Sequence, residues 1–285
     1  MKKILKILLW SILSLVFLAV LFVAGFIYKV TYGFPVYYET KAPKIDFPEG
    51  RIKKVLLFSK VTGYNHGESI KAAKKVFADL AKKNAWFLYE SEEGGVFNPE
   101  QLAKFNTVIF NNCTGRLLNK TQQKALEVYI QQGGSFIGIH GAGDNSHHWD
   151  WYEQELIGVR FSHHPIKQQF QEAIITRNPL PDSLLLQRLP ETWTHTDEWY
   201  VFYENPRDKG FQVIYAIDGE KIEPNGNLLW ITSKNFGMGK DHPVAWYRAV
   251  GKGRTFYTSI GHDARSWQQK PFVQMFENAI NSWGR

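Results

Sequence analysis

The sequence predicts an α/β protein, in which a mostly parallel sheet is flanked by helices and an apolar helix precedes the folded domain. Three observations support this fold class. Short apolar runs in the first half lack the polar alternation of half-exposed strands, which is typical of strands buried on both faces. Apolar residues at helical spacing separate these runs. The chain has 285 residues, of which 44% are hydrophobic, and this length is enough for a sizeable core.

The N-terminus predicts a membrane anchor. Three lysines, Lys2, Lys3 and Lys6, precede residues 7–28, which form a run of 22 uncharged positions. A helix of that length crosses a hydrocarbon core of about 30 Å, and its basic flank is expected to stay in the cytoplasm. The alternative is a signal peptide cleaved near Ala24. In both cases the rest of the chain is exported, so we expect a domain on the periplasmic or cell-surface side.

The chain divides into three segments. Residues 1–29 are the expected transmembrane anchor or signal. Residues 30–52 mix aromatic residues with three prolines and show neither a helical nor a strand period, so they are expected to form an extended stem. Residues 53–285 are the expected folded domain.

Charge and composition narrow the function classes. The net charge is +7, but four lysines in the first 30 residues account for 4 of it, which leaves +3 for the other 255 residues. This weak excess opposes a nucleic-acid partner. Aromatic residues make up 15% of the chain, including ten Trp, and rings in such numbers suit stacking on sugars as well as core packing. The single cysteine excludes an internal disulfide and a cysteine-based zinc site.

The first half of the domain contains four expected strands, at residues 53–59, 86–91, 107–112 and 135–140. A helical stripe from Ile70 to Ala81 follows the first strand. Asn119 and Gln122 form a capping-box pattern at the start of a second helix, and Gly133 ends it. The alternation of strands with helices predicts the parallel part of the sheet.

The second half is less regular. Strands are expected at residues 168–176, 211–217, 242–250 and 254–262, with a hairpin turn at residues 251–253 joining the last two. A closing amphipathic helix is expected to start at Pro271.

Polar residues follow several of these strands, at the edge where open parallel sheets bind ligands. His66 follows the first strand, Asn112 the third, His140 and Asp144 the fourth, and His262 the last. Each of these residues could instead have a purely structural role; His66, for example, could cap the following helix. His140 and His262 are the stronger candidates, because glycines beside them let the backbone approach a ligand.

His140 occupies an unusual place in the frame of residues 138–142, GIHGA. Many α/β enzymes carry a nucleophile at the centre of such a tight strand-to-helix turn, and here an imidazole takes its place. The stretch WTHTDEWY adds Glu198 and Trp199 as candidates. Adjacent residues on a strand point to opposite faces, so only one of Asp197 and Glu198 is expected to reach the pocket, and we favour Glu198. Cys113 has no histidine beside it in the sequence and is expected to be a packing residue.

Taken in order, the motifs KVLLFSKVTGYNHGESI, TVIFNNCTG, QQGGSFIGIHGAGD, HTDEWYVF and HPVAWYRAVGKGRTFYTSIGHD resemble the ThuA-like, or trehalose-utilisation, family over residues 53–285. The resemblance implies a flavodoxin-like domain related in fold to the class I glutamine amidotransferases. It also implies a role in disaccharide metabolism, particularly with sugars oxidised to keto forms. In the amidotransferases the turn carries a cysteine, so the histidine at this position argues against glutamine amidotransferase chemistry.

These observations lead to one hypothesis and one rival. The hypothesis is an exported, membrane-anchored protein that acts on a sugar or keto-glycoside as a hydrolase, lyase or isomerase, through His140, His262 and Glu198. Its substrate is expected to contact five further residues, His66, Asn112, Asp144, Trp199 and His242. If a divalent metal such as zinc is bound, its expected ligands are His140, His164 and His262. The rival is a non-catalytic sugar-binding domain tethered to the membrane.

Overall fold

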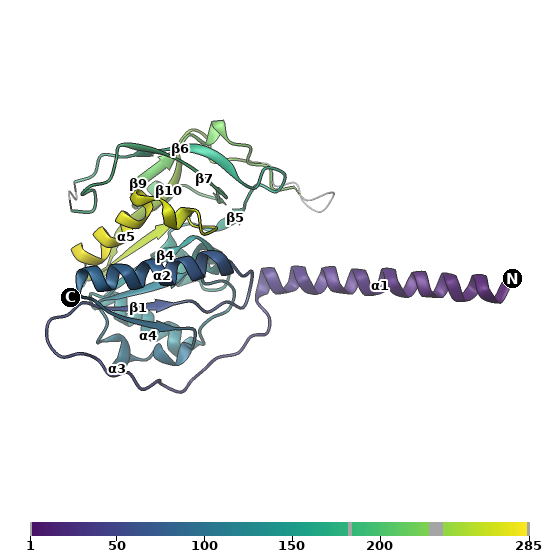
Figure 1. The fold of residues 1–285 in the computed structure, drawn as a ribbon, viewed down its shortest axis with the longest axis horizontal. Helices are drawn as coiled ribbons and strands as arrows, with labels where there is room; N and C mark the ends of the chain where they lie inside the picture. The colour runs from purple at the N-terminus through teal and green to yellow at the C-terminus, as the bar shows by residue number, and fades with distance from the viewer. Residues whose placement is uncertain (1, 182–183, 228–235, 284–285) are drawn as a thin grey trace.

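The computed structural model describes residues 2–181, 184–227 and 236–283. A nine-stranded mixed sheet runs through the domain in the order β2-β1-β3-β4-β11-β10-β9-β6-β7 (Figure 1). Its parallel half consists of β1 (Lys54–Phe58), β2 (Phe87–Ser91), β3 (Thr107–Asn111), β4 (Ser135–Ile139) and β11 (Gly253–Thr258). The predicted α/β class is confirmed.

The second half of the chain extends this sheet with antiparallel strands. They are β10 (His242–Val250), β9 (Gln212–Ile217), β6 (Gln171–Arg177) and β7 (Thr192–Asp197). The predicted turn at residues 251–253 joins β10 to β11, and Gly251 has a φ of +58° there. Two short strands, β5 (Phe161–His163) and β8 (Val201–Phe202), form a separate antiparallel pair that the sequence pattern did not indicate.

Helices cover both faces of the parallel half. Leu57 points toward one face, where the apolar residues of α2 (Gly67–Asn84) and α5 (Lys270–Ser282) pack. Leu56 points toward the other, where α3 (Pro99–Leu102), α4 (Lys120–Gln131) and the π-helical segment Tyr152–Ile157 pack. Strands buried on both sides explain the continuous apolar runs of the sequence. The predicted capping box of α4 is present, with Asn119 and Gln122 bonding each other's backbone N–H.

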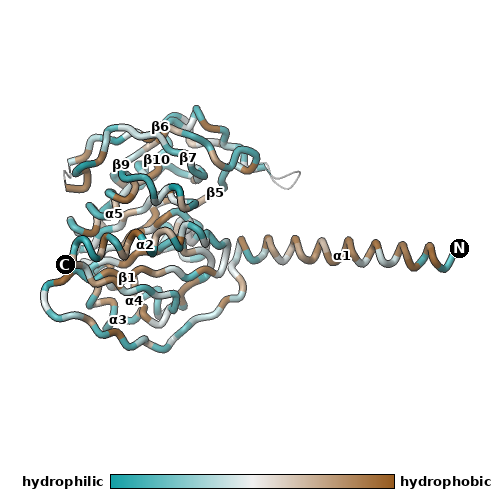
Figure 2. The backbone as a smooth tube through the Cα atoms, in the orientation of Figure 1, coloured by the Kyte–Doolittle hydropathy of each residue, from teal (hydrophilic) through white to brown (hydrophobic). Residues whose placement is uncertain are grey.

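The N-terminal helix α1 (Lys2–Tyr32) projects from the domain, and none of its residues is buried (Figures 1 and 2). It is long and apolar enough to cross a membrane, with a mean hydropathy of 2.8 over its most apolar 18-residue window. The expected stem differs from a free extended tether. The helix continues to Tyr32, and the following residues lie against the domain, where Phe47 packs on Phe87 and Phe105.

Candidate active site

The centre of the site lies at the end of β4. His140 follows this strand with a φ of +41°, in the left-handed region that few residues other than glycine adopt. Three contacts hold this conformation: Nδ1 of His140 lies 2.6 Å from the carbonyl oxygen of Ser259, the Tyr257 hydroxyl donates to the carbonyl of His140 at 2.9 Å, and the amide of Gly141 donates to Asn112 at 3.2 Å. The turn therefore fixes the imidazole before any ligand binds.

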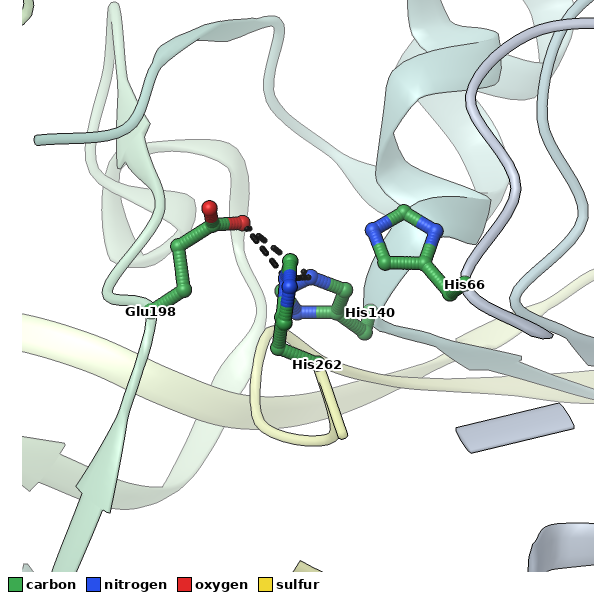
Figure 3. Close-up of side chains that lie close together, drawn as sticks. All are labelled: His66, His140, Glu198 and His262. Carbon is green, nitrogen blue, oxygen red and sulfur yellow. Dashed lines mark hydrogen bonds and ion pairs between the residues drawn. The ribbon is translucent and has the colours of Figure 1, made fainter. Parts of the chain in front are cut away.

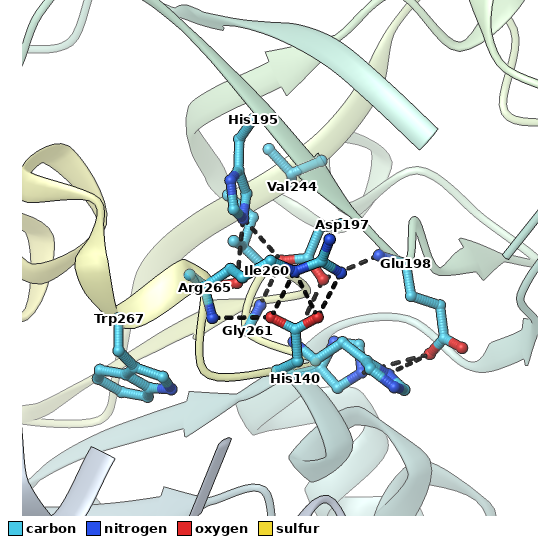
Figure 4. Close-up of polar contacts among 12 residues, drawn as sticks. His140, His195, Asp197, Glu198, Val244, Ile260, Gly261, Arg265 and Trp267 are labelled. Atoms are coloured by element: carbon cyan, nitrogen blue, oxygen red, sulfur yellow. Dashed lines mark hydrogen bonds and ion pairs between the residues drawn. The ribbon is translucent and has the colours of Figure 1, made fainter. Parts of the chain in front are cut away.

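Glu198 is positioned by its neighbour Asp197, the last residue of β7. Asp197 is fully buried and accepts hydrogen bonds from the backbone N–H groups of Glu198, Gly261 and His262, at 2.8, 2.8 and 3.2 Å. The hydroxyl of Ser266 adds a fourth bond at 2.8 Å. Nε2 of His195 lies 3.3 Å from the same carboxylate oxygen (Figure 4). One carboxylate thus ties the end of β7 to the loop after β11, which carries His262.

Four potential ligand atoms converge between these elements. One atom from each of His66, His140, Glu198 and His262 can be chosen so that all lie within 4.8 Å of one another (Figure 3). Nδ1 of His262 lies 2.9 Å from Oε2 of Glu198 and 3.2 Å from Nε2 of His140, and Nε2 of His140 lies 3.4 Å from the same Oε2. The structure therefore brings together the three residues that the sequence suggested as catalytic.

With neutral imidazole rings, the hydrogen-bond network leaves this cluster short of protons. Because a carbonyl oxygen only accepts, Nδ1 of His140 is the donor toward Ser259, and Nε2 carries a lone pair whenever that ring is neutral. The N–H of His262 then faces two acceptors, Nε2 of His140 and the Glu198 carboxylate. Nδ1 of His66 is buried and has no hydrogen-bond partner among the described residues. A cation at the centre, either an added proton or a metal ion, would pair these lone pairs.

The electrostatics of the cluster describe the state in which an added proton occupies the centre. Burial opposes ionisation of Glu198, but proton-bearing imidazoles of His140 and His262 beside its Oε2 outweigh burial and hold the pKa of Glu198 far below its ordinary value. Burial lowers the pKa of His262, but the bond to Glu198 and the nearby carboxylates raise it overall. Burial and the neighbouring histidines lower the pKa of His66 well below its ordinary value. His66 is therefore neutral at pH 7, as a metal ligand must be.

A pocket of about 140 Å³ opens beside this cluster. Five sequence candidates line it: His66, Asp144, His164, Glu198 and His262. It is smaller than the usual pocket of about 300 to 1,000 Å³, so it suits a small polar ligand or one terminal unit of a larger one. Burial and the Glu198 charge raise the pKa of Asp144 well above its ordinary value, which favours the protonated form of this carboxyl.

The other candidates lie outside the pocket lining. Trp199 is a core residue whose indole N–H donates to the carbonyl of Gln171 at 2.8 Å. Asn112 braces the turn, donating to Ser69 at 3.0 Å while it accepts from Gly141. Nε2 of His242 lies 2.9 Å from the carbonyl oxygen of Tyr200, and burial lowers its pKa to about 4. These three residues support the site from behind.

His164 takes a different place from the one expected for a metal ligand. Its Nδ1 lies 3.1 Å from Oε1 of Glu198, on the oxygen that faces away from His140 and His262. His66, which the sequence suggested as a substrate contact, lines the pocket and also belongs to the group of four ligand atoms. Residue spacing in the sequence could not show which of His66 and His164 lies among the four ligand atoms, because loop conformations determine the positions of both.

Sequence reasoning missed several residues of the pocket. The side-chain amide of Gln169 donates to Oε1 of Glu198 at 2.6 Å, and the ring of Tyr200 lies 4.2 Å from that of His140. Phe161, Tyr64 and Val30 complete the lining. Tyr64 and Tyr200 lie within two of the motifs quoted above, so membership of these motifs was an available signal. Val30 belongs to α1, and no pattern indicated that this helix reaches the site.

Cys113 lies apart from this chemistry. It is fully buried, its sulfur lies 3.1 Å from the carbonyl oxygen of Phe58, and burial raises its thiol pKa well above the ordinary value. A thiol held protonated is a poor nucleophile.

The set of three imidazoles and one carboxylate is a donor set that zinc and similar divalent ions accept. The partnerless nitrogen of His66 and the shared proton of His262 fit such an ion. The same four groups can also act as a proton relay, since each lies within reach of its neighbour.

Comparisons with known proteins agree with the fold. The family model described as ThuA, trehalose utilisation, matches residues 54–283. A ThuA-like protein from Bacteroides uniformis has a similar structure, with a TM-score of 0.66, 20% identity, and coverage of 87% of this chain and 94% of the other. A ThuA-like protein from Parabacteroides merdae is similar with a TM-score of 0.59 and 16% identity, and the match covers 82% of this chain and 92% of the other. A cytoplasmic protein of Salmonella typhimurium is similar with a TM-score of 0.53 and 10% identity, and the match covers 81% of this chain and 100% of the other. No curated sequence matches the chain. Since the family model covers nearly the whole domain, the chain belongs to the ThuA-like, trehalose-utilisation family.

Proposed function

We propose that this protein is a membrane-anchored, extracytoplasmic enzyme that acts on a sugar or keto-glycoside in the use of trehalose-type disaccharides. The main observation that supports this proposal is the convergence of His66, His140, His262 and Glu198 beside a pocket. With neutral imidazole rings, these four side chains have more lone pairs than protons among them. Family membership supports a carbohydrate ligand. The exposed apolar helix and its N-terminal lysines support the anchor and its orientation.

The surroundings of the pocket suit a sugar. Tyr64, Phe161 and Tyr200 offer ring faces or edges for the CH groups of a pyranose, and Asp144, His164 and Gln169 offer polar atoms for its hydroxyls. Aromatic walls combined with a few convergent polar groups are the usual composition of a small-molecule site.

For a keto sugar, the arrangement supports proton abstraction next to the carbonyl. Glu198 or the imidazole of His262 takes the proton from carbon, and the electron pair of that C–H bond forms a C=C bond as the carbonyl π electrons move to oxygen. In isomerisation the proton returns to the former carbonyl carbon, and the proton of the neighbouring hydroxyl passes to the former carbonyl oxygen, so the carbonyl moves by one carbon. In elimination the electron pair expels the glycosidic oxygen, which takes a proton from the second group of the pair. Each outcome conserves atoms and electrons.

The proton transfers described above use these groups without a metal. When a divalent metal is bound, the same four groups would hold it as ligands, and it would stabilise negative charge on the carbonyl oxygen. The residues of the chain perform the other tasks. The turn at His140 fixes the cluster, Asp197 orients Glu198, and Gln169 and His164 hold the second oxygen of that carboxylate.

Purified full-length protein in detergent tests this function. Metal content by elemental analysis and turnover of keto-glycosides should both be lost in His140→Ala and in His262→Ala. Cys113→Ser is the matched control and should keep both. Saccharide binding without turnover and without metal would favour the rival, a tethered binding domain.

A further inference from the structure

The junction between α1 and the domain is tightly packed. Gly33 ends the helix with a φ of +75°, and a Cβ at this position would lie 2.5 Å from Oγ1 of Thr62 and 3.0 Å from the amide nitrogen of Arg116. The next residue, Phe34, donates its N–H to the carbonyl of Thr62 at 2.8 Å. Thr62 and Arg116 lie in the loops after β1 and β3, so α1 joins the domain at the carboxyl edge of the parallel strands.

The segment after the junction is fixed at further points. The buried ammonium of Lys60 donates to the carbonyl of Tyr37 at 2.7 Å and to the carboxylate of Glu39 at 2.8 Å. That carboxylate also accepts from the amide of Gly94 at 2.8 Å, and the side chain of Gln122 donates to the carbonyl of Glu39 at 2.6 Å. Residues 33–39, here called the collar, therefore couple the orientation of α1 to that of the domain.

The position of Val30 sets the depth of the site. The uncharged run of residues 7–28 is 22 residues long, which corresponds to roughly 33 Å of helix and matches the hydrocarbon core of about 30 Å. Val30 lines the pocket of the site and follows this run by two residues, about 3 Å along the helix axis. The headgroup layer on each side is roughly 5 to 8 Å thick. The pocket thus lies at the level of the headgroups.

Exposed aromatic residues surround the same edge. Tyr64 is 41% exposed at the pocket, and Phe170, 40% exposed, lies 5.1 Å from the ring of His262. Tyr32 and Phe34, at the junction, are 46% and 59% exposed. Exposed aromatic side chains at this level are typical of the membrane interface, where Tyr and Trp concentrate.

The geometry points to a site that faces the bilayer and takes the saccharide headgroup of a membrane glycolipid. This inference rests on the proposed function, because it assumes both the anchor and a saccharide ligand. A headgroup in the same leaflet is already at the depth of the pocket, whereas a free sugar has to diffuse between the domain and the membrane. The small pocket suits the terminal sugar of such a headgroup.

The first test measures orientation and needs no ligand. Full-length Tyr64→Cys and Lys252→Cys variants are labelled with a fluorophore and placed in phosphatidylcholine vesicles that contain a headgroup-linked nitroxide quencher. Lys252 lies in the turn before β11, so at least one strand length, roughly 17 Å, separates it from the site edge. Quenching should be several-fold stronger at position 64 than at position 252. Equal quenching at both positions would overturn the inferred orientation.

The second test identifies the ligand through protection of an unlabelled Phe170→Cys thiol from a water-soluble reagent, because Phe170 lies beside His262 but outside the pocket lining. A diglycosyl diacylglycerol in the same vesicles should slow modification several-fold, while the matching methyl glycoside at equal total concentration should not. Equal protection by both would leave the saccharide function standing and refute the glycolipid ligand. Protection by neither, with quenching still stronger at position 64, would refute the saccharide function and the glycolipid ligand with it.

Discussion

Replacing Asp197 with asparagine removes one buried charge and leaves the size of the side chain unchanged. Asp197 only accepts hydrogen bonds, and three backbone N–H groups and the Ser266 hydroxyl converge on it. An asparagine side chain has one accepting oxygen and one donating amide. Whichever way the amide turns, its NH₂ group faces at least one backbone N–H, and that donor loses its partner.

The loss of folding stability in Asp197→Asn can be estimated from these contacts. A buried backbone donor without a partner costs about 1 to 3 kcal/mol, and loss of the charge weakens the bonds that remain by about 1 kcal/mol. We therefore expect Asp197→Asn to lower the free energy of unfolding by about 2 to 4 kcal/mol. For a domain of this size, that change lowers Tm by roughly 5 to 15 °C.

Thermal and urea unfolding of the full chain in detergent would measure this effect. Asp263→Asn is the control, because Asp263 is partly exposed and its main partner is the exposed guanidinium of Arg265, so a change within about 0.5 kcal/mol is expected. The reasoning fails if Asp197→Asn costs less than about 1 kcal/mol, or if the control is equally destabilised. Because Asp197 orients Glu198, ligand binding should weaken in the first variant only.

Four further predictions concern the metal, the thiol, the collar and the membrane. Zinc added to chelator-treated protein at 100 times its Kd should stabilise the domain by about 2.7 kcal/mol. His66→Ala and Glu198→Gln should each abolish most of this stabilisation, and an unchanged Tm with zinc would argue against the metal site. Cys113→Ser should keep activity and metal content, and strong loss in a folded variant would return the thiol to the mechanism. Burial opposes ionisation of Glu39, but its bonds to Lys60 and Gly94 lower its pKa overall. The ionised carboxylate therefore stabilises the collar above the unfolded pKa of about 4.3, and this stabilisation is lost as the pH falls through the lower pKa of the folded state. Limited proteolysis should cut the collar faster in acid, and an identical pH profile in Glu39→Gln would contradict this. The intact chain should stay in carbonate-washed membranes, whereas a mature chain starting near Phe26 would indicate a cleaved signal.

Local patterns predicted most of the parallel half of the fold. The runs at β1, β3 and β4 are buried on both faces, and their composition shows it. The capping box at Asn119 is likewise a local signal. The short strands β5 and β8 carry no such pattern, since a pair of two or three residues is determined by the surrounding packing.

Candidate residues could be brought together from the sequence where the backbone topology determines their position. Parallel strands end at one edge, so placing His140 and His262 there needed only the strand assignments. The expectation that Glu198 and Asp197 alternate on one strand was inexact, because β7 ends at Asp197, and it gave no sign that Asp197 would bond the loop after β11. The collar was missed for the same reason, because residues 30–52 interact with partners such as Lys60 and Gln122 that are distant in sequence.

The turn at His140 connects the fold to the chemistry. Asn112 and His140 end the neighbouring strands β3 and β4 with φ values of +51° and +41°, and such conformations cost about 1 to 3 kcal/mol each. The hydrogen bond from Gly141 to Asn112 links the two turns, so each supports the other. A turn that presents a nucleophile in related folds here directs a ring nitrogen toward Glu198 and His262. Under the proposed function, the geometry that favours attack on a substrate in those folds would instead allow these fixed lone pairs to share a cation.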